Sequence, residues 1–242
     1  MVAITPHLTR LIAGIPVPNT PLINASISLA RASMPDHGFN HVMRAWLNGQ
    51  AIINHLPPHN RSQIDVEAFG VAAILHDMGW AFNTSFISTN KIFEVDGANA
   101  ARDFIRAEGG EGWNEHRIQL VWDSIALHTY VDVAQYKQPE VAITSGGTYT
   151  ELVGVELGKA AFGDLITVNQ TEYDAISTVY PRSGLLGYLN ETSIELCKLK
   201  PAATYLNFVG DWGEKYVPGY TKVGHRVIDL LESALPAEKR AN

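Results

Sequence analysis

Phe69-Gly-Val-Ala-Ala-Ile-Leu75 is a run of apolar residues that leads directly into the polar pair His76-Asp77. Asp65 before the run has the side chain of a helix N-cap, and Gly79 after it is typical of a helix end. We therefore expect a helix from Val66 to about Met78. A helix that is apolar on almost every side is buried on every side. The sequence thus predicts a central helix with a polar pair at its carboxyl end.

The flanking segments predict more helices and little sheet, because their apolar residues recur at helical spacing and alternating runs are short. We expect Asn40 to cap a helix that runs from His41 to about Leu56. A second group of segments shows the same periodicity: 22–33, about 96–109, 115–127, 141–155, 173–180, 193–198 and 223–235. We expect an extended lead-in over residues 15–21 and a loop over 158–169.

These elements predict an all-α fold with about eight to ten helices. The chain has 242 residues, of which 46% are hydrophobic, so it is long enough to bury a substantial core. We expect a single domain over residues 1–242. Its core would cover about 20–185, and a C-terminal helical extension would cover about 186–242.

The charge balance excludes several classes of partner. The formal net charge is −7, and the 18 Lys and Arg residues are scattered rather than clustered. Binding to nucleic acid or to an anionic membrane needs a basic surface, so we expect neither.

Cys197 is the single cysteine, which excludes an internal disulfide and predicts a small buried side chain. With no long apolar run and no leader pattern, the sequence predicts a cytoplasmic protein.

Histidine is the informative residue type, with nine copies in an acidic chain. Burial of an aspartate such as Asp77 costs several kcal/mol unless it is paired or binds a metal. His41 lies in the first turn of one predicted helix, and His128 follows the end of another. Imidazole and carboxylate together are ligands that suit zinc, iron or manganese. The alternative is that each is an ordinary hydrogen-bonded core residue.

Several short motifs, taken together, resemble those of the HD-domain metal-dependent hydrolases, and within them the fungal cyanamide hydratase group. The resemblance covers roughly Pro16 to Val217. The motifs are Phe39-Asn-His-Val-Met-Arg44, Ala73-Ile-Leu-His-Asp-Met-Gly79, the segment 93–104, Ile125-Ala-Leu-His-Thr129, Pro139-Glu-Val-Ala142 and Tyr180-Pro-Arg182. The resemblance implies an HD-domain helical bundle.

The resemblance also implies a set of metal ligands. The first three are His41, His76 and Asp77. The last ligand of the family is an aspartate followed three residues later by glycine, and Glu151-Leu-Val-Gly154 stands at that place. We therefore predict Glu151 as the fourth ligand, with Asp164 and Glu156 as alternatives.

Two further residues are candidates for the reaction itself. His128 could hydrogen-bond the substrate or carry a proton, and its alternative role is structural. Lys91 lies where the family lines its pocket and could bind an anionic or dipolar substrate, or simply be a solvated lysine. Arg44 is three residues after His41, so we expect it to pair with a buried carboxylate near the same helix face.

The resemblance implies an enzyme that adds water to a small nitrile-like substrate, as in the conversion of cyanamide to urea. The cofactor would be one divalent metal ion, zinc first, with iron or manganese as alternatives. The partner would be a small molecule, and a homo-oligomer is open. Competing hypotheses are an HD-type phosphohydrolase and a non-catalytic scaffold with a degenerate metal site. A dinuclear iron oxygenase is disfavoured, because His116 and His128 would lie about 18 Å apart on one helix.

Overall fold

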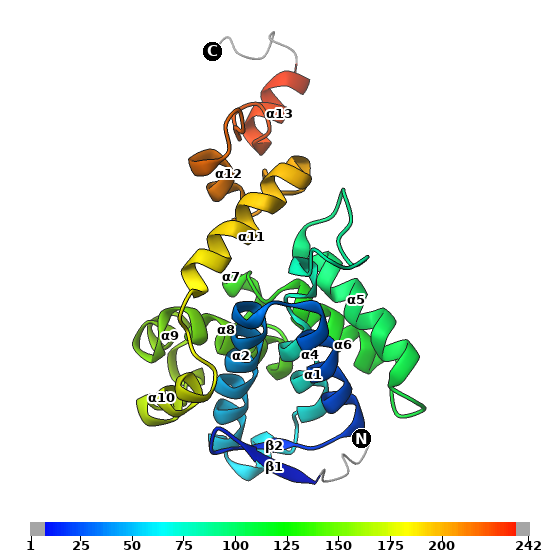
Figure 1. Cartoon of the computed structure of the whole chain (residues 1–242), viewed down its shortest axis with the longest axis vertical. Helices are drawn as coiled ribbons and strands as arrows, with labels where there is room; N and C mark the ends of the chain where they lie inside the picture. The colour runs from blue at the N-terminus through cyan, green and yellow to red at the C-terminus, as the bar shows by residue number, and fades with distance from the viewer. Residues whose placement is uncertain (1–7, 236–242) are drawn as a thin grey trace. The chain divides into compact units, whose positions relative to one another are not determined.

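The computed structural model describes residues 8–235 and confirms the all-α fold class (Figure 1). Within this range there are 13 α-helices, above the predicted eight to ten, and one two-stranded sheet. The chain divides into two compact units. The first contains residues 8–87 and 93–185, and the second contains 88–92 and 186–235. Residues 1–7 and 236–242 of the predicted domain lie outside the described range.

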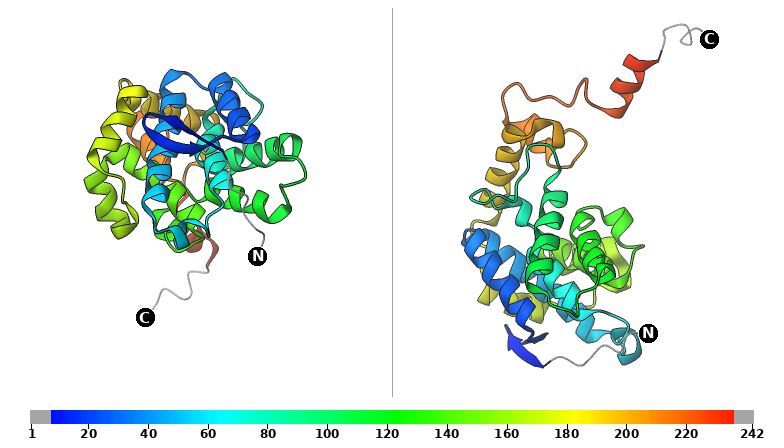
Figure 2. Two further views of the ribbon diagram at one scale, coloured as in Figure 1. Left: turned by 90° about the horizontal axis from the view of Figure 1, so that it is seen from below. Right: turned by 90° about the vertical axis from the view of Figure 1, so that its right-hand side faces the viewer.

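The centre of the first unit is α4 (Val66–Leu75), drawn in cyan in Figure 2, as the apolar run predicts. The Asp65 side chain caps it by accepting a hydrogen bond from the Ala68 backbone N–H at 3.0 Å. Every residue of α4 after Val66 is buried. The helices that contact it are α1 (Pro21–Ser33), α2 (Asp36–His55), α5 (Phe93–Glu108), α6 (Glu115–Ala126) and α8 (Pro139–Val153).

Several predicted boundaries are wrong. Helix α2 begins at Asp36 after Pro35, so Asn40 lies inside it rather than at its cap. Helix α4 ends at Leu75, and a short 3₁₀ helix, η1 (Met78–Trp80), follows. The remaining elements of the first unit are α3 (Pro58–Arg61), α7 (Val131–Ala134), α9 (Val155–Phe162), η2 (Gly163–Leu165) and α10 (Gln170–Val179).

Two segments, predicted as a loop and as an extended lead-in, contain regular structure. Residues 158–169 begin inside α9, where Gly158 has a packing role: a Cβ there would overlap the Thr150 side chain. The expected extended lead-in belongs to a hairpin of β1 (Thr9–Ile12) and β2 (Ile15–Pro18). Its turn places Ala13 and Gly14 at φ of 51° and 79°. Asn-Gly is the common sequence of such a turn, so the Ala-Gly pair is a weak indication of a hairpin.

The contact between α2 and α8 is unusually close because both helices have a glycine where they cross. A Cβ on Gly147 would lie 2.8 Å from the Ala45 carbonyl oxygen and 2.9 Å from the Gly49 nitrogen. Helix α2 carries His41 and α8 carries Glu151. The glycine pair therefore lets backbones approach closely enough for these two side chains to meet.

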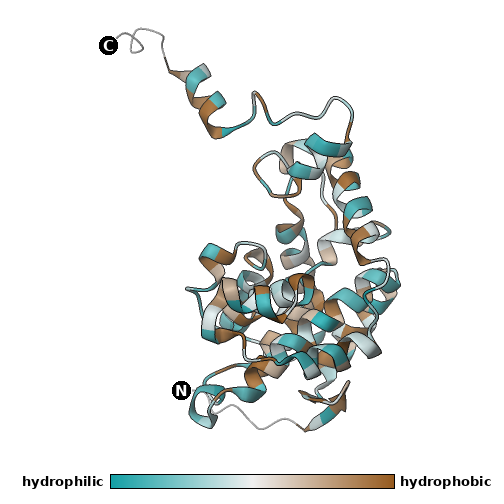
Figure 3. Ribbon diagram, turned by 90° about the vertical axis from the view of Figure 1, so that its left-hand side faces the viewer, coloured by the Kyte–Doolittle hydropathy of each residue, from teal (hydrophilic) through white to brown (hydrophobic). Residues whose placement is uncertain are grey.

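The second unit contains α11 (Leu185–Leu199, which starts on the last residue of the first unit), η3 (Pro201–Ala203), α12 (Gly210–Tyr216) and α13 (Val227–Ala234). Cys197 is buried here, as predicted, and donates to the Val209 carbonyl. Figure 3 shows apolar and polar residues interspersed along these helices. No described helix is long and apolar enough to cross a membrane.

We expect the Gly147→Ala substitution to destabilise the protein by about 1–3 kcal/mol, because the added methyl overpacks a backbone contact. Thermal unfolding would measure the change. The control is Gly187→Ala in α11, where an added Cβ meets no atom within 4 Å. This control should lose no stability, since alanine is the better helix former. Equal losses in both variants would contradict the assigned role of Gly147.

Candidate metal centre

Three side chains predicted from the sequence meet in the first unit. The His41 Nε2 atom lies 3.2 Å from His76 Nε2 and 3.2 Å from Asp77 Oδ2. His76 Nε2 lies 3.4 Å from the same carboxylate oxygen. All three residues are at most 2% exposed. This buried group of two imidazoles and one carboxylate could hold a metal ion.

Helix ends position the group. His41 lies in the second turn of α2, His76 is the C-cap of α4, and Asp77 is the residue before η1. The start of α5 packs against this turn so closely that a Cβ on Gly79 would overlap the Phe93 carbonyl oxygen. Glycine at this position therefore allows the chain to leave α4 and turn both His76 and Asp77 toward His41.

His128 lies beside this group, directly after α6. Its Nε2 atom is 3.6 Å from Asp77 Oδ1, and its ring centroid is 4.7 Å from that of His76. Its position is therefore at the edge of the three-residue group. The sequence identified His128 as a candidate. It did not predict the contact between His128 and Asp77, because that contact depends on where α6 ends and how it packs.

Hydrogen bonds on the outer side of each ring fix which nitrogen faces inward. The Nδ1 atoms of His76 and His128 lie 2.8 Å and 2.7 Å from the backbone carbonyls of Ala73 and Ile125. A carbonyl only accepts, so both Nδ1 atoms carry hydrogen, and the Nε2 lone pairs face Asp77 when the rings are neutral. His41 Nδ1 faces a carboxylate instead, at 2.9 Å from Glu151 Oε2.

The separations fit a single bound cation. Two ligands at zinc–nitrogen distances in a tetrahedral site lie about 3.3 Å apart, close to the observed 3.2–3.4 Å. Both oxygens of Asp77 are buried, and within residues 8–235 neither accepts a hydrogen bond of acceptable geometry. Lone pairs of neutral imidazoles would repel the buried carboxylate, so the group needs a cation, which is either the His41 proton or a bound metal ion.

The charges of the site shift the pKa values in different directions. Burial alone would lower the pKa of His41, but Glu151 and Asp77 outweigh it and raise the value to about 9. Burial opposes ionisation of Asp77, yet His76 and His41 hold its pKa well below the usual range. Burial and then His76 lower the pKa of His128 to about 3. Thus His128 is neutral and Asp77 ionised at neutral pH.

The structure does not place Glu151 among the ligand atoms, which corrects the prediction of a fourth ligand. Its carboxylate lies on the outer side of the His41 ring, at Nδ1, whereas Nε2 faces the group. Glu151 is fully buried, and its Oε1 atom pairs with Arg44. The predicted pairing of Arg44 with a buried carboxylate is confirmed. Burial opposes ionisation of Glu151, but His41 and Arg44 lower its pKa.

The remaining candidates lie outside the group. Asp164 and Glu156 are exposed, in η2 and α9. Lys91 is exposed in the second unit, with its Nζ atom 3.4 Å from Asn90 Oδ1. Two buried aromatic residues also contact the site. The Trp80 ring stacks on His41 at 6.5 Å, and the Phe93 ring meets His128 edge-on at 5.7 Å.

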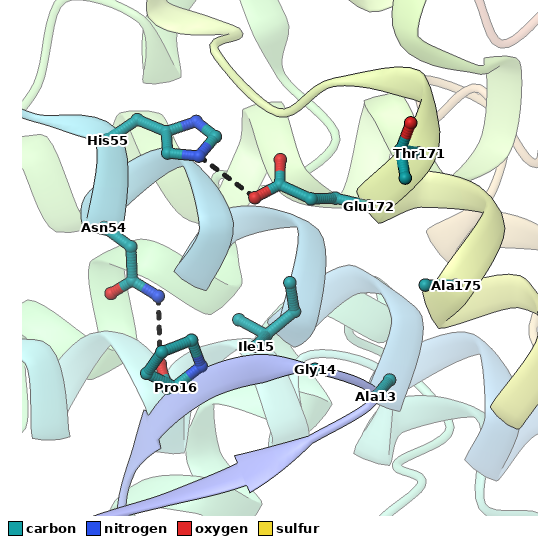
Figure 4. A pocket seen from close by; sticks show the side chains of 9 residues that line it. All are labelled: Ala13, Gly14, Ile15, Pro16, Asn54, His55, Thr171, Glu172 and Ala175. Carbon is teal, nitrogen blue, oxygen red and sulfur yellow. Dashed lines mark hydrogen bonds and ion pairs between the residues drawn. The ribbon is translucent and has the colours of Figure 1, made fainter.

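A separate cavity of about 290 Å³ lies at the hairpin turn (Figure 4). It is lined by residues of the turn, the end of α2 and the start of α10. His55 spans its upper side, with Nε2 3.0 Å from Glu172 Oε1 and Nδ1 2.9 Å from the Thr167 carbonyl. None of its lining residues belongs to the buried histidine group.

Comparison with protein-family models and with curated protein sequences gives no significant match. The geometry of the buried group therefore carries the functional argument.

We expect metal binding to weaken as the pH falls. A ligand histidine must be neutral, and His41 is protonated in the metal-free protein because its pKa is about 9. Metal uptake at pH 7 should therefore release the His41 proton, and the affinity should rise about tenfold per pH unit toward pH 9. Zinc titrations in weakly buffered solution measure the proton, and titrations at pH 6.5–8.5 measure the affinity. A pH-independent affinity would contradict this electrostatic description.

Substitutions can separate a residue that supplies a ligand atom from a residue that only orients a ligand. We expect His76→Ala to lose the metal, because it removes a ligand atom. Glu151→Gln should keep one ion per chain but bind it about 10–100-fold more weakly, as is typical for partners of ligand histidines. Elemental analysis and competition titration measure both. Glu140→Gln, a buried acid on the same helix α8, is the control and should bind normally. Loss of stoichiometric metal in Glu151→Gln would restore Glu151 as a ligand.

Proposed function

We propose that this protein is a metal-dependent hydratase or hydrolase of the HD-domain type, acting on a small nitrile-like molecule. One observation carries the proposal: His41, His76 and Asp77 direct ligand atoms toward one buried point, with His128 beside them. Zinc is the first candidate for the ion, with iron and manganese as alternatives, because these ligands suit all three.

Three protein ligands leave a coordination position open, as in catalytic rather than structural metal sites. A divalent cation held there supplies Lewis acidity, which lowers the pKa of a water molecule toward neutrality and polarises an electron-poor carbon. Within this arrangement His41, His76 and Asp77 hold the ion. The Glu151 carboxylate fixes the His41 ring by accepting from Nδ1.

His128 is suited to orient the attacking water. Its Nδ1–H is committed to the Ile125 carbonyl, and its depressed pKa of about 3 keeps the ring neutral. The free Nε2 lone pair, 3.6 Å from Asp77 Oδ1, can accept a hydrogen bond from a water molecule next to the ligands. His128 is thus proposed as an acceptor that positions water.

The surroundings favour a small and uncharged substrate. The four site residues are at most 4% exposed, and Trp80 and Phe93 add apolar rings against His41 and His128. Buried apolar surroundings disfavour a charged ligand unless an opposite charge compensates it. A short nitrile meets both conditions, and hydration of cyanamide to urea remains the reaction to test first.

A phosphohydrolase is the less well supported alternative. It requires cationic groups for the phosphate. Two of the three candidate cations are committed elsewhere: Arg44 pairs with Glu151, and Arg182 donates to backbone carbonyls of α8. The third, Lys91, belongs to the other unit. A scaffold with a degenerate site is less well supported still, because His41, His76 and Asp77 are all present and direct ligand atoms toward one buried point.

We expect the purified protein to contain about one zinc or iron per chain and to hydrate cyanamide or another small nitrile. Chelation should abolish the activity, and the ion should restore it. His128→Ala should lower kcat about 100-fold at unchanged metal content, because the attacking water would no longer be held in position. His116→Ala, at the exposed start of α6, is the control.

The outcomes separate the alternatives. Hydrolysis of phosphate esters without nitrile hydration would favour the phosphohydrolase. Full activity in a metal-free protein, or in His76→Ala without its ion, would refute the metal mechanism. A folded protein that takes up no metal would favour the scaffold.

A further inference from the structure

Three consecutive residues, Tyr180, Pro181 and Arg182, directly follow α10, and we call them the anchor segment. The buried guanidinium of Arg44 holds it from α2. The Arg44 Nη1 group donates to the Tyr180 carbonyl at 3.1 Å and to the Pro181 carbonyl at 2.8 Å. The Tyr180 ring also meets the Phe39 ring edge-on at 6.3 Å. The anchor segment is therefore fixed to the part of α2 that carries His41.

The opposite edge of Arg44 fixes the Glu151 carboxylate. Its Nε donates to Glu151 Oε1, and its Nη2 pairs with the same oxygen. This leaves Oε2 for His41 Nδ1 at 2.9 Å. Arg44 is 1% exposed and Glu151 0%, so water does not compete for these groups. The direction of the carboxylate, and with it the His41 ring, follows from where Arg44 is held.

Arg182 holds the backbone of Glu151 from the other side. Its Nη1 donates to the Glu151 carbonyl and to the Tyr173 hydroxyl, and its Nη2 donates to the Leu152 carbonyl at 2.9 Å. These carbonyls belong to the last turn of α8, where a helix leaves acceptors unsatisfied. The anchor segment thus determines both the side-chain direction and the backbone position of Glu151.

We infer that the anchor segment controls the metal affinity of the buried group, with Arg44 and Arg182 as positioning residues that act on His41 through Glu151. The inference rests on the metal site proposed above and extends it to regulation. A ligand ring that is free to rotate binds its ion more weakly than one that is held in place. Any event that displaces residues 180–182 should therefore weaken metal binding without touching a ligand.

Arg182 is the best position for a test, because it contacts no ligand residue and is 33% exposed. We expect Arg182→Gln in the full chain to weaken Zn²⁺ binding about tenfold, within the range for partners of ligand histidines. We also expect Co²⁺ bound to this variant to show an altered absorption spectrum. Competition titration and Co²⁺ spectra measure the two effects. The control is Lys137→Gln, a cation of equal exposure (32%) that pairs with Asp123 on α6.

A second variant addresses Arg44, whose removal would leave a buried charge. Arg44→Lys keeps the charge, but an ammonium group cannot donate to a carboxylate and two backbone carbonyls with the geometry of a planar guanidinium. We expect it to weaken Zn²⁺ binding at least as much as Arg182→Gln. Circular dichroism would check that each variant is folded.

The results distinguish this inference from the proposed function. If the wild-type protein binds no metal, the proposed function itself fails. If it binds metal and Arg182→Gln and Arg44→Lys bind equally well, the metal site stands and the control by the anchor segment is refuted. Equal losses in Arg182→Gln and Lys137→Gln would also refute it, because they would indicate a general loss of stability.

Discussion

The burial of the Asp77 carboxylate is the constraint on which the rest of the site depends. It is 2% exposed at the end of the most apolar helix, where an isolated charge would cost several kcal/mol. The structure compensates it with imidazole nitrogens from three different helix regions. Bringing these regions together requires the close packing at Gly79, where the start of α5 meets the turn, and at Gly147, where α8 meets α2. Much of the core geometry can therefore be understood as a means to surround one carboxylate.

A second buried acid, Glu151, has the opposite role. It lies on the outer side of the His41 ring and pairs with Arg44, whereas Asp77 faces the imidazoles of His41, His76 and His128. The two acids therefore divide the work. Glu151 holds the orientation of the His41 ring, and Asp77 leaves a buried negative charge that could pair with a bound ion. Position 151 is not required to reach an ion held by the other three residues.

The sequence predicts the parts of this arrangement that are local. The apolar run before His76 predicts α4, and the cost of burying Asp77 predicts a ligand function. The position of Arg44 three residues after His41 predicts that Arg44 pairs with a buried carboxylate. The outward position of Glu151 could not be predicted, because it depends on which nitrogen of His41 faces α8. The same holds for His128, whose approach to Asp77 depends on how α6 packs. Gly158 misled because a glycine can mark either a loop or, as here, a close contact inside a helix.

The charges of the site also bear on its chemistry. In the metal-free protein the raised pKa of His41 makes its ring cationic, so His41 and Arg44 offset the charges of Asp77 and Glu151, and Arg182 adds a partly exposed cation 3.9 Å from Glu151 Oε1. A divalent ion that replaced the His41 proton would add one excess positive charge in a buried place. That charge would be costly unless an anionic group compensated it, which would favour the ionised form of a water molecule or substrate beside the ion. The Glu151–Arg44 pair contributes no net charge, so it orients His41 without cancelling this excess. A site that held Glu151 without Arg44 would bind the ion with an extra negative charge and would weaken its effect on water.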